Sequence, residues 1–171
     1  MTHRSCAGGF SLLECLLAIS LLAILSSVVV VHTGGDRARQ QLTAAAQGLQ
    51  MAIDRGRLSA LRRQQACALR LTDVGLQPDG AGALPSCPSS GVVLVDPLTT
   101  SGVSLHTNVS GLLRFSANGL LLDGGLVVFS HPASQHRPCV VVSLPLGVTR
   151  QGVYGIDPAA QLSSSHCLPR S

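Results

Sequence analysis

The only glutamate in the chain, Glu14, lies near the start of an apolar run that covers residues 10–31. A carboxylate is costly to bury in a bilayer or a helix bundle, so an ionisable residue at such a place is expected to serve a function. Gly9 and Phe10 stand just before it, behind a leader that carries Arg4. A cut after Gly9 would make Phe10 the new N-terminus and Glu14 the fifth residue. The freed amine can then pair with the Glu14 carboxylate of a neighbouring copy and fix the register of the two helices.

No catalytic constellation stands out in the sequence. It contains no G-x-S-x-G element, no H-E-x-x-H motif and no P-loop. Residues 80–82 lack a third glycine at phosphate-binding spacing, and His131 and His136 flank a Pro-containing loop, where we expect surface residues. There is no C-x-x-C and the histidines are scattered. We therefore expect a structural protein rather than an enzyme, with no cofactor and no metal site.

The cysteines point to disulfides instead. Cys6 lies in the leader, and Cys15 lies in the apolar run, where it packs as a small apolar residue. The other four stand in the rest of the chain: Cys67, Cys87, Cys139 and Cys167. Four cysteines allow three pairings, and the sequence alone does not choose between them. We favour Cys67–Cys87 with Cys139–Cys167, because each pair joins a strand to a nearby loop or tail.

Other kinds of N-terminal segment fit the apolar run less well. A secretory signal has an apolar core of about 7–15 residues, which is shorter than residues 10–31. A lipoprotein cut needs a small residue before the cysteine, whereas Glu14 precedes Cys15. A plain membrane anchor stays open, because about 20 apolar residues can cross the hydrocarbon core. Charge does not orient the segment, since Arg37 and Arg39 follow it and one arginine precedes it.

Residues 37–65 are predicted to form an amphipathic helix. Gly34 and Gly35 interrupt the apolar run, and Asp36 is the expected helix start. Apolar or small residues then recur at three- and four-residue steps: Leu42, Ala46, Leu49, Ile53, Gly56 and Ala60. Gly48 and Gly56 cost about 1 kcal/mol each relative to alanine, so they suit a close approach of a sheet to this helix.

After residue 66 the pattern changes to short strands separated by Gly-, Pro- and Ser-rich loops at residues 79–90 and 132–138. The expected strands are residues 66–71, 91–95, 103–106, 112–115, 120–122, 126–129 and 139–144. Residues from Pro158 onward are polar and expected to be loosely ordered. The economical architecture is α+β, one long helix packed on an antiparallel sheet.

Composition limits the choice of partners only weakly. The chain has twelve arginines, no lysine and a net charge of +4, which does not by itself indicate nucleic-acid binding. Seven of the arginines lie between residues 37 and 70, mostly off the apolar stripe. They are expected either to face solvent or to contact neighbouring subunits.

The N-terminal segment resembles the type IV prepilin class in the order of Gly9, Phe10, Glu14 and the apolar run. The resemblance implies cleavage after Gly9 and methylation of Phe10 by a prepilin peptidase, with Glu14 as the assembly carboxylate. It also implies a pilin-like fold and a single-pass protein of the bacterial inner membrane, with its C-terminal domain on the periplasmic side until assembly. The implied segments are a leader (1–9), a transmembrane and assembly helix (10–31), an amphipathic helix (32–66) and a β-rich domain (67–171).

The rest of the chain resembles the GspH/FimT group of minor pilins and pseudopilins. Residues 57–65 look like the end of that group's long helix, residues 113–119 like its Phe-x-x-x-Gly element, and residues 140–147 like its closing strand. The group's basic turn is represented by Arg150, one arginine short. Arg62, Arg63 and Arg150 are the candidate basic contacts.

Three functions follow from these resemblances. The first is a minor pilin, assembled into a type IV pilus through its N-terminal helix with other pilins. The second is a pseudopilin of a type II secretion system, which serves protein export. The third is a DNA-binding minor pilin of natural transformation, which would need a clustered basic surface.

Overall fold

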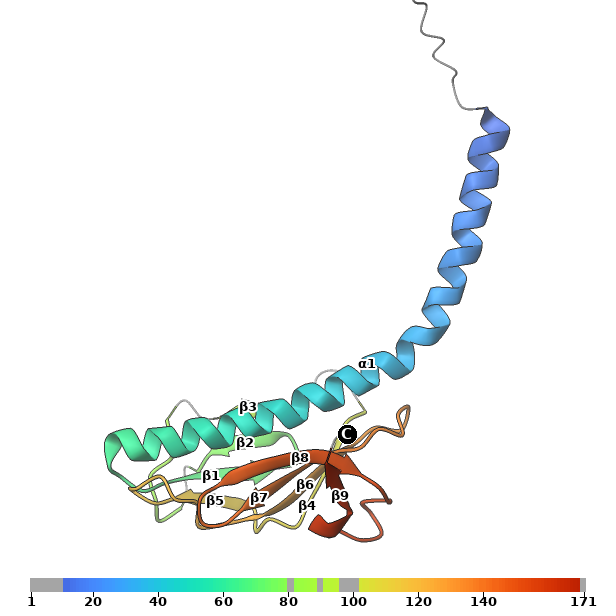
Figure 1. Cartoon of the computed structure of the whole chain (residues 1–171). Coiled ribbons are helices and arrows are strands. Elements are labelled where there is room, and N and C mark those ends of the chain that lie inside the picture. The colour runs from blue at the N-terminus through green and yellow to red at the C-terminus, as the bar shows by residue number, and fades with distance from the viewer. Residues whose placement is uncertain (1–10, 80–81, 89–90, 96–101, 170–171) are drawn as a thin grey trace, which may run out of the picture. The chain divides into compact units, whose positions relative to one another are not determined.

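The computed structural model describes residues 11–79, 82–88, 91–95 and 102–169, with side chains except those of residues 25–34. The chain divides into two compact units, Met1–Asp36 and Arg37–Ser171. Within the described residues it forms one α-helix, nine strands and a short 3-10 helix: α1 Leu12–Arg63, β1 Cys67–Thr72, β2 Gly75–Pro78, β3 Val92–Val93, β4 Ser104–Thr107, β5 Leu112–Phe115, β6 Gly125–Ser130, β7 Pro138–Ser143, β8 Val148–Tyr154, η1 Ser164–His166 and β9 Cys167–Pro169 (Figure 1).

Helix α1 is continuous from Leu12 to Arg63, so the predicted helix start at Asp36 is wrong. Gly34 and Gly35 lie inside the helix. Each glycine in a helix interior costs only about 1 kcal/mol, and helical turns already formed on both sides propagate through such a site without a new nucleation step. The helix ends where Gln64 takes a positive φ of 51° and the Gln65 N–H donates to the Ala60 carbonyl at 3.2 Å. The helix is thus capped at its C-terminus by a residue in the left-handed (αL) conformation, a position that glycine usually occupies.

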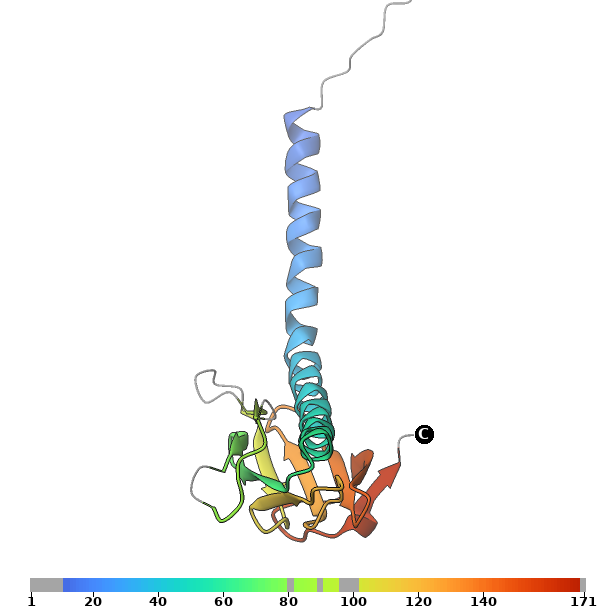
Figure 2. The same ribbon diagram turned by 90° about the vertical axis from the view of Figure 1, so that its left-hand side faces the viewer.

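The predicted apolar stripe of the helix is confirmed. Its members are all buried: Leu42, Ala46, Leu49, Ile53, Gly56 and Ala60. The stripe faces two antiparallel sheets rather than the single sheet expected. Sheet A has the strand order β3-β2-β1-β5, and sheet B has the order β4-β6-β7-β8-β9. Figure 2 looks along this half of the helix, with the green strands of sheet A on one side of it and the red strands of sheet B on the other.

One core joins the helix to both sheets. It contains fully buried side chains from all three elements: Leu49 and Ile53 of α1, Leu69 and Phe115 of sheet A, and Phe129 of sheet B. Gly56 permits the close approach of a sheet to the helix that was predicted from the sequence. A methyl group at Gly56 would lie 2.8 Å from two ring carbons of Phe115, so a glycine is required there if the ring is to keep its place.

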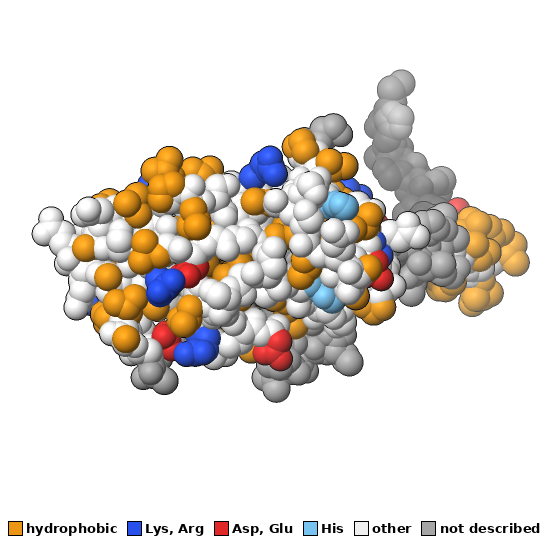
Figure 3. All heavy atoms as spheres, turned by 90° about the horizontal axis from the view of Figure 1, so that it is seen from below, with side chains coloured by type: hydrophobic (Ala, Val, Ile, Leu, Met, Phe, Trp, Pro, Cys, Tyr) orange, Lys and Arg blue, Asp and Glu red, His pale blue; other side chains and the backbone are white. Residues whose placement is uncertain are grey.

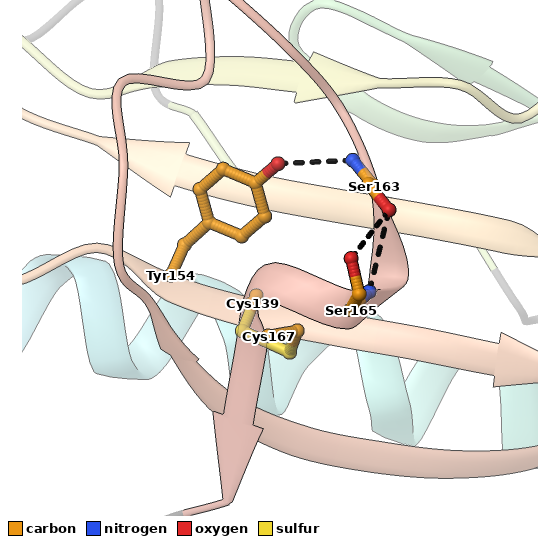
Figure 4. Close-up of a disulfide and its surroundings, with 5 residues drawn as sticks. All are labelled: Cys139, Tyr154, Ser163, Ser165 and Cys167. Carbon is orange, nitrogen blue, oxygen red and sulfur yellow. Dashed lines mark hydrogen bonds between the residues drawn. A yellow bond between two sulfur atoms is a disulfide. The ribbon is translucent and has the colours of Figure 1, made fainter.

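A second, smaller core lies on the other face of sheet B, under the C-terminal tail. Leu126 and Val128 of β6 pack there with Tyr154 and the Cys139–Cys167 disulfide. The Tyr154 hydroxyl donates to the Gln161 carbonyl at 2.7 Å and accepts from the Ser163 N–H at 2.9 Å, the latter drawn in Figure 4.

The expectation of a loosely ordered tail is therefore wrong for the described residues up to 169. Pro158 is buried, and the tail ends as β9, which pairs with β8. The local sequence is polar and Ser-rich, but a disulfide and a buried tyrosine hydroxyl hold it in place. The disulfide joins the tail to β7, and the tyrosine hydroxyl joins it to the end of β8.

The strands agree with the prediction in part. Strand β5 has the predicted bounds, and β1, β3, β4, β6 and β7 overlap the predicted runs. Residues 120–122 do not form a strand. Leu121 makes one isolated bridge with Phe115, while its N–H donates to the Pro145 carbonyl and the Leu122 N–H donates to the Arg114 carbonyl. The segment bonds to β5 on one side and to the loop at Pro145 on the other, so it does not form a continuous ladder with either.

Both disulfides join the cysteine pairs favoured from the sequence. Cys67 at the start of β1 bonds to Cys87 in the loop after β2, where the Cys87 N–H also donates to the Ala68 carbonyl at 3.1 Å. Cys139 of β7 bonds to Cys167 of β9. By the chain-entropy model, closures of 20 and 28 residues stabilise the fold by about 3–4 kcal/mol each.

Candidate functional site at the start of the long helix

Ser11 caps the helix just after the predicted cleavage position. Its hydroxyl accepts from the Leu13 N–H at 3.2 Å, and its carbonyl accepts from the Glu14 N–H at 2.9 Å. Glu14 follows in the first turn, where a carboxylate is favoured by the positive end of the helix dipole. The Glu14 side chain is exposed. The arrangement holds a free carboxylate at the helix start, available to a neighbour.

Ser11 is not among the residues whose role was predicted from the sequence. The Ser-x-x-Glu spacing of Ser11 and Glu14 is that of a capping box, a signal that marks helix starts. The predicted processing residues, Gly9 and Phe10, lie outside the described residues. Ser11 is the next residue after Phe10 in the sequence, and the helix begins at Leu12, directly after this cap.

The apolar side chains that follow Glu14 are open to the surroundings. The leucines and isoleucines of residues 12–24 are each exposed by more than half, from 53% at Leu21 to 78% at Leu12. A helix that is apolar on all sides requires an apolar environment or other helices around it. Among the residues with described side chains, no helix is long and apolar enough to cross a membrane. Phe10 and the side chains of residues 25–31, part of the predicted span, lie outside that description.

The three candidate basic residues do not form one cluster. Arg62 and Arg63 are exposed in the last turn of α1, and Arg150 is exposed on β8. Next to Arg150, the Gln151 amide donates to the Gln50 side-chain oxygen of α1 at 2.7 Å, so Arg150 faces away from the helix. Arg62 follows Gln50 by twelve residues, about 18 Å along the helix axis.

Two further arginines are neutralised by aspartates. Arg70 pairs with the buried Asp79 at 2.8 Å, and Arg114 pairs with Asp123 at 2.7 Å. The hydrogen bonds from the Arg114 side chain hold the pKa of Asp123 below its usual value, against the effect of burial and with help from the Arg114 backbone N–H. On the face shown in Figure 3, the basic side chains (blue) form a few separate patches, and some of these patches lie beside acidic side chains (red).

One comparison with known proteins gives a match. Residues 4–30 match the prokaryotic N-terminal methylation motif. No curated protein and no solved structure matches the chain. The matched residues include Gly9, Phe10, Ser11 and Glu14, and the match supports a type IV pilin-like protein. The motif implies processing by a prepilin peptidase, membrane anchoring and assembly with other pilins.

Proposed function

We propose that this chain is a minor pilin-like structural subunit without enzymatic activity. In this proposal a prepilin peptidase cuts it after Gly9 and methylates Phe10, and the subunit then enters a type IV pilus through its N-terminal helix. The observation that carries the proposal is the exposed carboxylate of Glu14 at the capped start of an exposed apolar helix. Before assembly the subunit is anchored in the bacterial inner membrane, and residues 37–171 lie on the periplasmic side.

Glu14 has a physical task in this scheme. Burying apolar helices against each other removes the charged groups at their N-termini from water, which is costly for an unpaired charge. The methylated amine of one subunit and the Glu14 carboxylate of the next compensate each other if the two helices are staggered by a fixed amount. Buried ion pairs of this kind are best attested as devices that set register.

A type II secretion pseudopilin is the main alternative, because the same helix, processing and fold would serve a secretion filament. The resemblance to the GspH/FimT group includes both kinds of subunit. Cross-linking of a tagged chain in its native membrane, followed by mass spectrometry of the captured neighbours, distinguishes pilus subunits from secretion subunits. DNA binding ranks third, because Arg62 and Arg63 are far from Arg150 along the domain and Arg70 and Arg114 are paired with aspartates.

The proposal is tested by replacing Glu14. We expect Glu14→Ala and Glu14→Gln to be processed normally, since both keep Gly9 and Phe10, but to enter sheared filaments at least about tenfold less than the natural chain. The reason is that an unpartnered charge in a formerly paired, buried site costs about 3–5 kcal/mol. Glu14→Asp keeps the charge and should retain part of the incorporation.

Asp54→Ala is the matched control, because Asp54 is also an exposed carboxylate on α1 but lies in the half that packs on the sheets. It should assemble like the natural chain. Immunoblots of the filament and membrane fractions, with mass spectrometry of the N-terminal peptide, give both readouts. Normal incorporation of Glu14→Ala would remove the proposed role of this carboxylate.

A further inference from the structure

A polar cavity of about 560 Å³ opens between the loop that joins β6 to β7 and the segment that follows β8. The first side includes His131, Gln135 and Arg137, and the second side consists of Asp157 and Pro158. The volume lies within the range of small-molecule sites, about 300–1,000 Å³. It belongs wholly to residues 37–171 and has no part in the N-terminal motif.

Two opposite charges line this cavity without pairing. An Arg137 Nη1–H donates to the Ile156 carbonyl at 3.1 Å, which ties the guanidinium to the segment after β8. The Asp157 carboxylate accepts from the Ala159 N–H at 3.0 Å, which fixes its position in a turn. Within the described residues, the ion pairs are those of Arg70 and Arg114, so neither Arg137 nor Asp157 is neutralised by a charged neighbour.

Three of the other lining side chains can both donate and accept hydrogen bonds. The Ser134 hydroxyl accepts from the His136 N–H at 3.2 Å and keeps its own hydrogen to donate. The Gln135 side chain is exposed and offers an amide with both functions. His131 Nδ1 accepts from the Ala133 N–H at 3.0 Å, so the neutral ring carries its proton on Nε2. The loop is thus held by its own hydrogen bonds, with polar groups to spare.

We infer that the cavity binds a neutral, hydroxyl-rich ligand, that is, a saccharide unit. An anion would pair with Arg137 but would be repelled by Asp157, and a cation would meet the reverse situation. A hydroxyl group donates to the carboxylate and accepts from the guanidinium, so one neutral ligand satisfies both charges. Pro132 and Pro158 add apolar surface for the carbon-bound face of a sugar ring. The site would let the subunit recognise carbohydrate on a surface, which is an activity beyond its assembly into a filament.

The experiment uses the full chain in dodecylphosphocholine micelles, because this detergent carries no sugar. D-Glucose, D-galactose, N-acetyl-D-glucosamine and inorganic phosphate are titrated separately, and binding is followed by the amide chemical shifts of the 15N-labelled chain. At least one saccharide should bind saturably at millimolar concentration, and phosphate should bind more weakly than that saccharide. Arg137→Gln and Asp157→Asn should each weaken saccharide binding by about tenfold, the effect of losing one charged hydrogen bond.

The variants are chosen to separate binding from folding. Asp157→Asn keeps the side-chain oxygen that accepts from the Ala159 N–H, and Gln135→Ala removes only an exposed side chain, so both should melt like the natural chain. Gln135→Ala should weaken saccharide binding several-fold. Arg150→Gln removes an exposed arginine outside the cavity and should leave saccharide binding unchanged. Absence of saturable saccharide binding, tighter binding of phosphate, or unchanged affinity in the cavity variants would each overturn the inference.

Discussion

Asp123 illustrates how a single residue can link stability to pH. The Arg114 side chain donates two hydrogen bonds to the Asp123 carboxylate, at 2.7 and 2.8 Å, and the Arg114 backbone N–H donates a third at 3.0 Å. These bonds lower the pKa of Asp123 in the folded chain below its ordinary value of 3.8. A depressed carboxylate pKa stabilises the fold above the unfolded pKa, and this contribution is lost as the pH falls through the folded pKa.

We therefore predict that Asp123→Asn lowers the melting temperature at pH 7 by a small amount. The difference from the natural chain should shrink as the pH falls below about 4 and should close only below the depressed pKa of Asp123 in the folded chain, where both side chains are neutral. Thermal melts by circular dichroism from pH 7 down to about pH 2 measure this. Asp54→Asn, an exposed carboxylate outside both ion pairs, provides the control. A difference that stays constant over the whole range would contradict the role given to Asp123.

Gly56 gives a second prediction at the scale of a residue. Gly56→Ala places a methyl group against the buried ring of Phe115, and overpacking of this kind costs about 1–3 kcal/mol. The better helix propensity of alanine returns about 1 kcal/mol, so we expect a net loss of roughly 1 kcal/mol in the free energy of unfolding. Denaturant unfolding of the full chain measures it.

Gly35→Ala is the matched control for Gly56. It lies in the same helix with nothing within 4 Å of the added methyl group, so propensity alone acts there and the substitution should not destabilise the chain. The prediction for Gly56 fails if Gly56→Ala is as stable as Gly35→Ala.

At the scale of elements, β9 lies over β8 at Gly152. Cys139 of β7 is opposite Gly152 in the β7–β8 ladder, and its disulfide reaches past β8 to Cys167 of β9. A side chain at Gly152 would collide with the Leu168 carbonyl oxygen and would lie 3.1 Å from the Cys167 sulfur. The absent side chain is what lets the disulfide and β9 pack over this strand.

Gly152→Ala should therefore loosen β9 without disturbing the core under the helix. We predict faster amide hydrogen exchange in peptides that cover residues 164–169, measured by mass spectrometry, and unchanged exchange in β1 and β5. Gly155→Ala, where the nearest atom lies 4.0 Å from the added methyl group, should exchange like the natural chain. Unchanged protection of residues 164–169 in Gly152→Ala would show that β9 does not depend on this glycine.

The elements that sequence analysis predicted are those with a strong local pattern. The apolar stripe from Leu42 to Ala60 repeats at helical spacing, and its side chains are buried as expected. The short run that forms β5 has clear ends, because Gly111 precedes it and Ser116 follows it. Strand β8 was missed because Arg150, Gln151 and Gly152 break any apolar alternation. It is a strand because β7 and β9 pair with it on both sides, which no local pattern expresses.

The same distinction applies to the sites. Gly9, Phe10 and Glu14 stand within six residues, so their spacing alone predicts a prepilin-type start. Arg137 and Asp157 lie twenty residues apart and become neighbours of one cavity only through the fold. Nothing in their local sequence indicates that they share a site.

At the scale of the whole molecule, the proposed assembly depends on what happens to the first residues of the chain. The methylation motif over residues 4–30 implies processing of this end of the chain and assembly with other pilins. The exposed apolar side chains at the start of the helix are consistent with a surface that other subunits cover. The two disulfides cross-link the β-rich part of the chain, which agrees with the periplasmic location proposed for it, because disulfides persist in oxidising compartments.

The most direct test is the mass of the N-terminal peptide of the chain isolated from its native membrane and filament fractions. We predict a peptide that begins at Phe10, carries one N-methyl group and is enriched in the filament fraction. A chain that still begins at Met1 in every fraction would contradict it, because an uncut leader cannot supply the amine that Glu14 is proposed to receive.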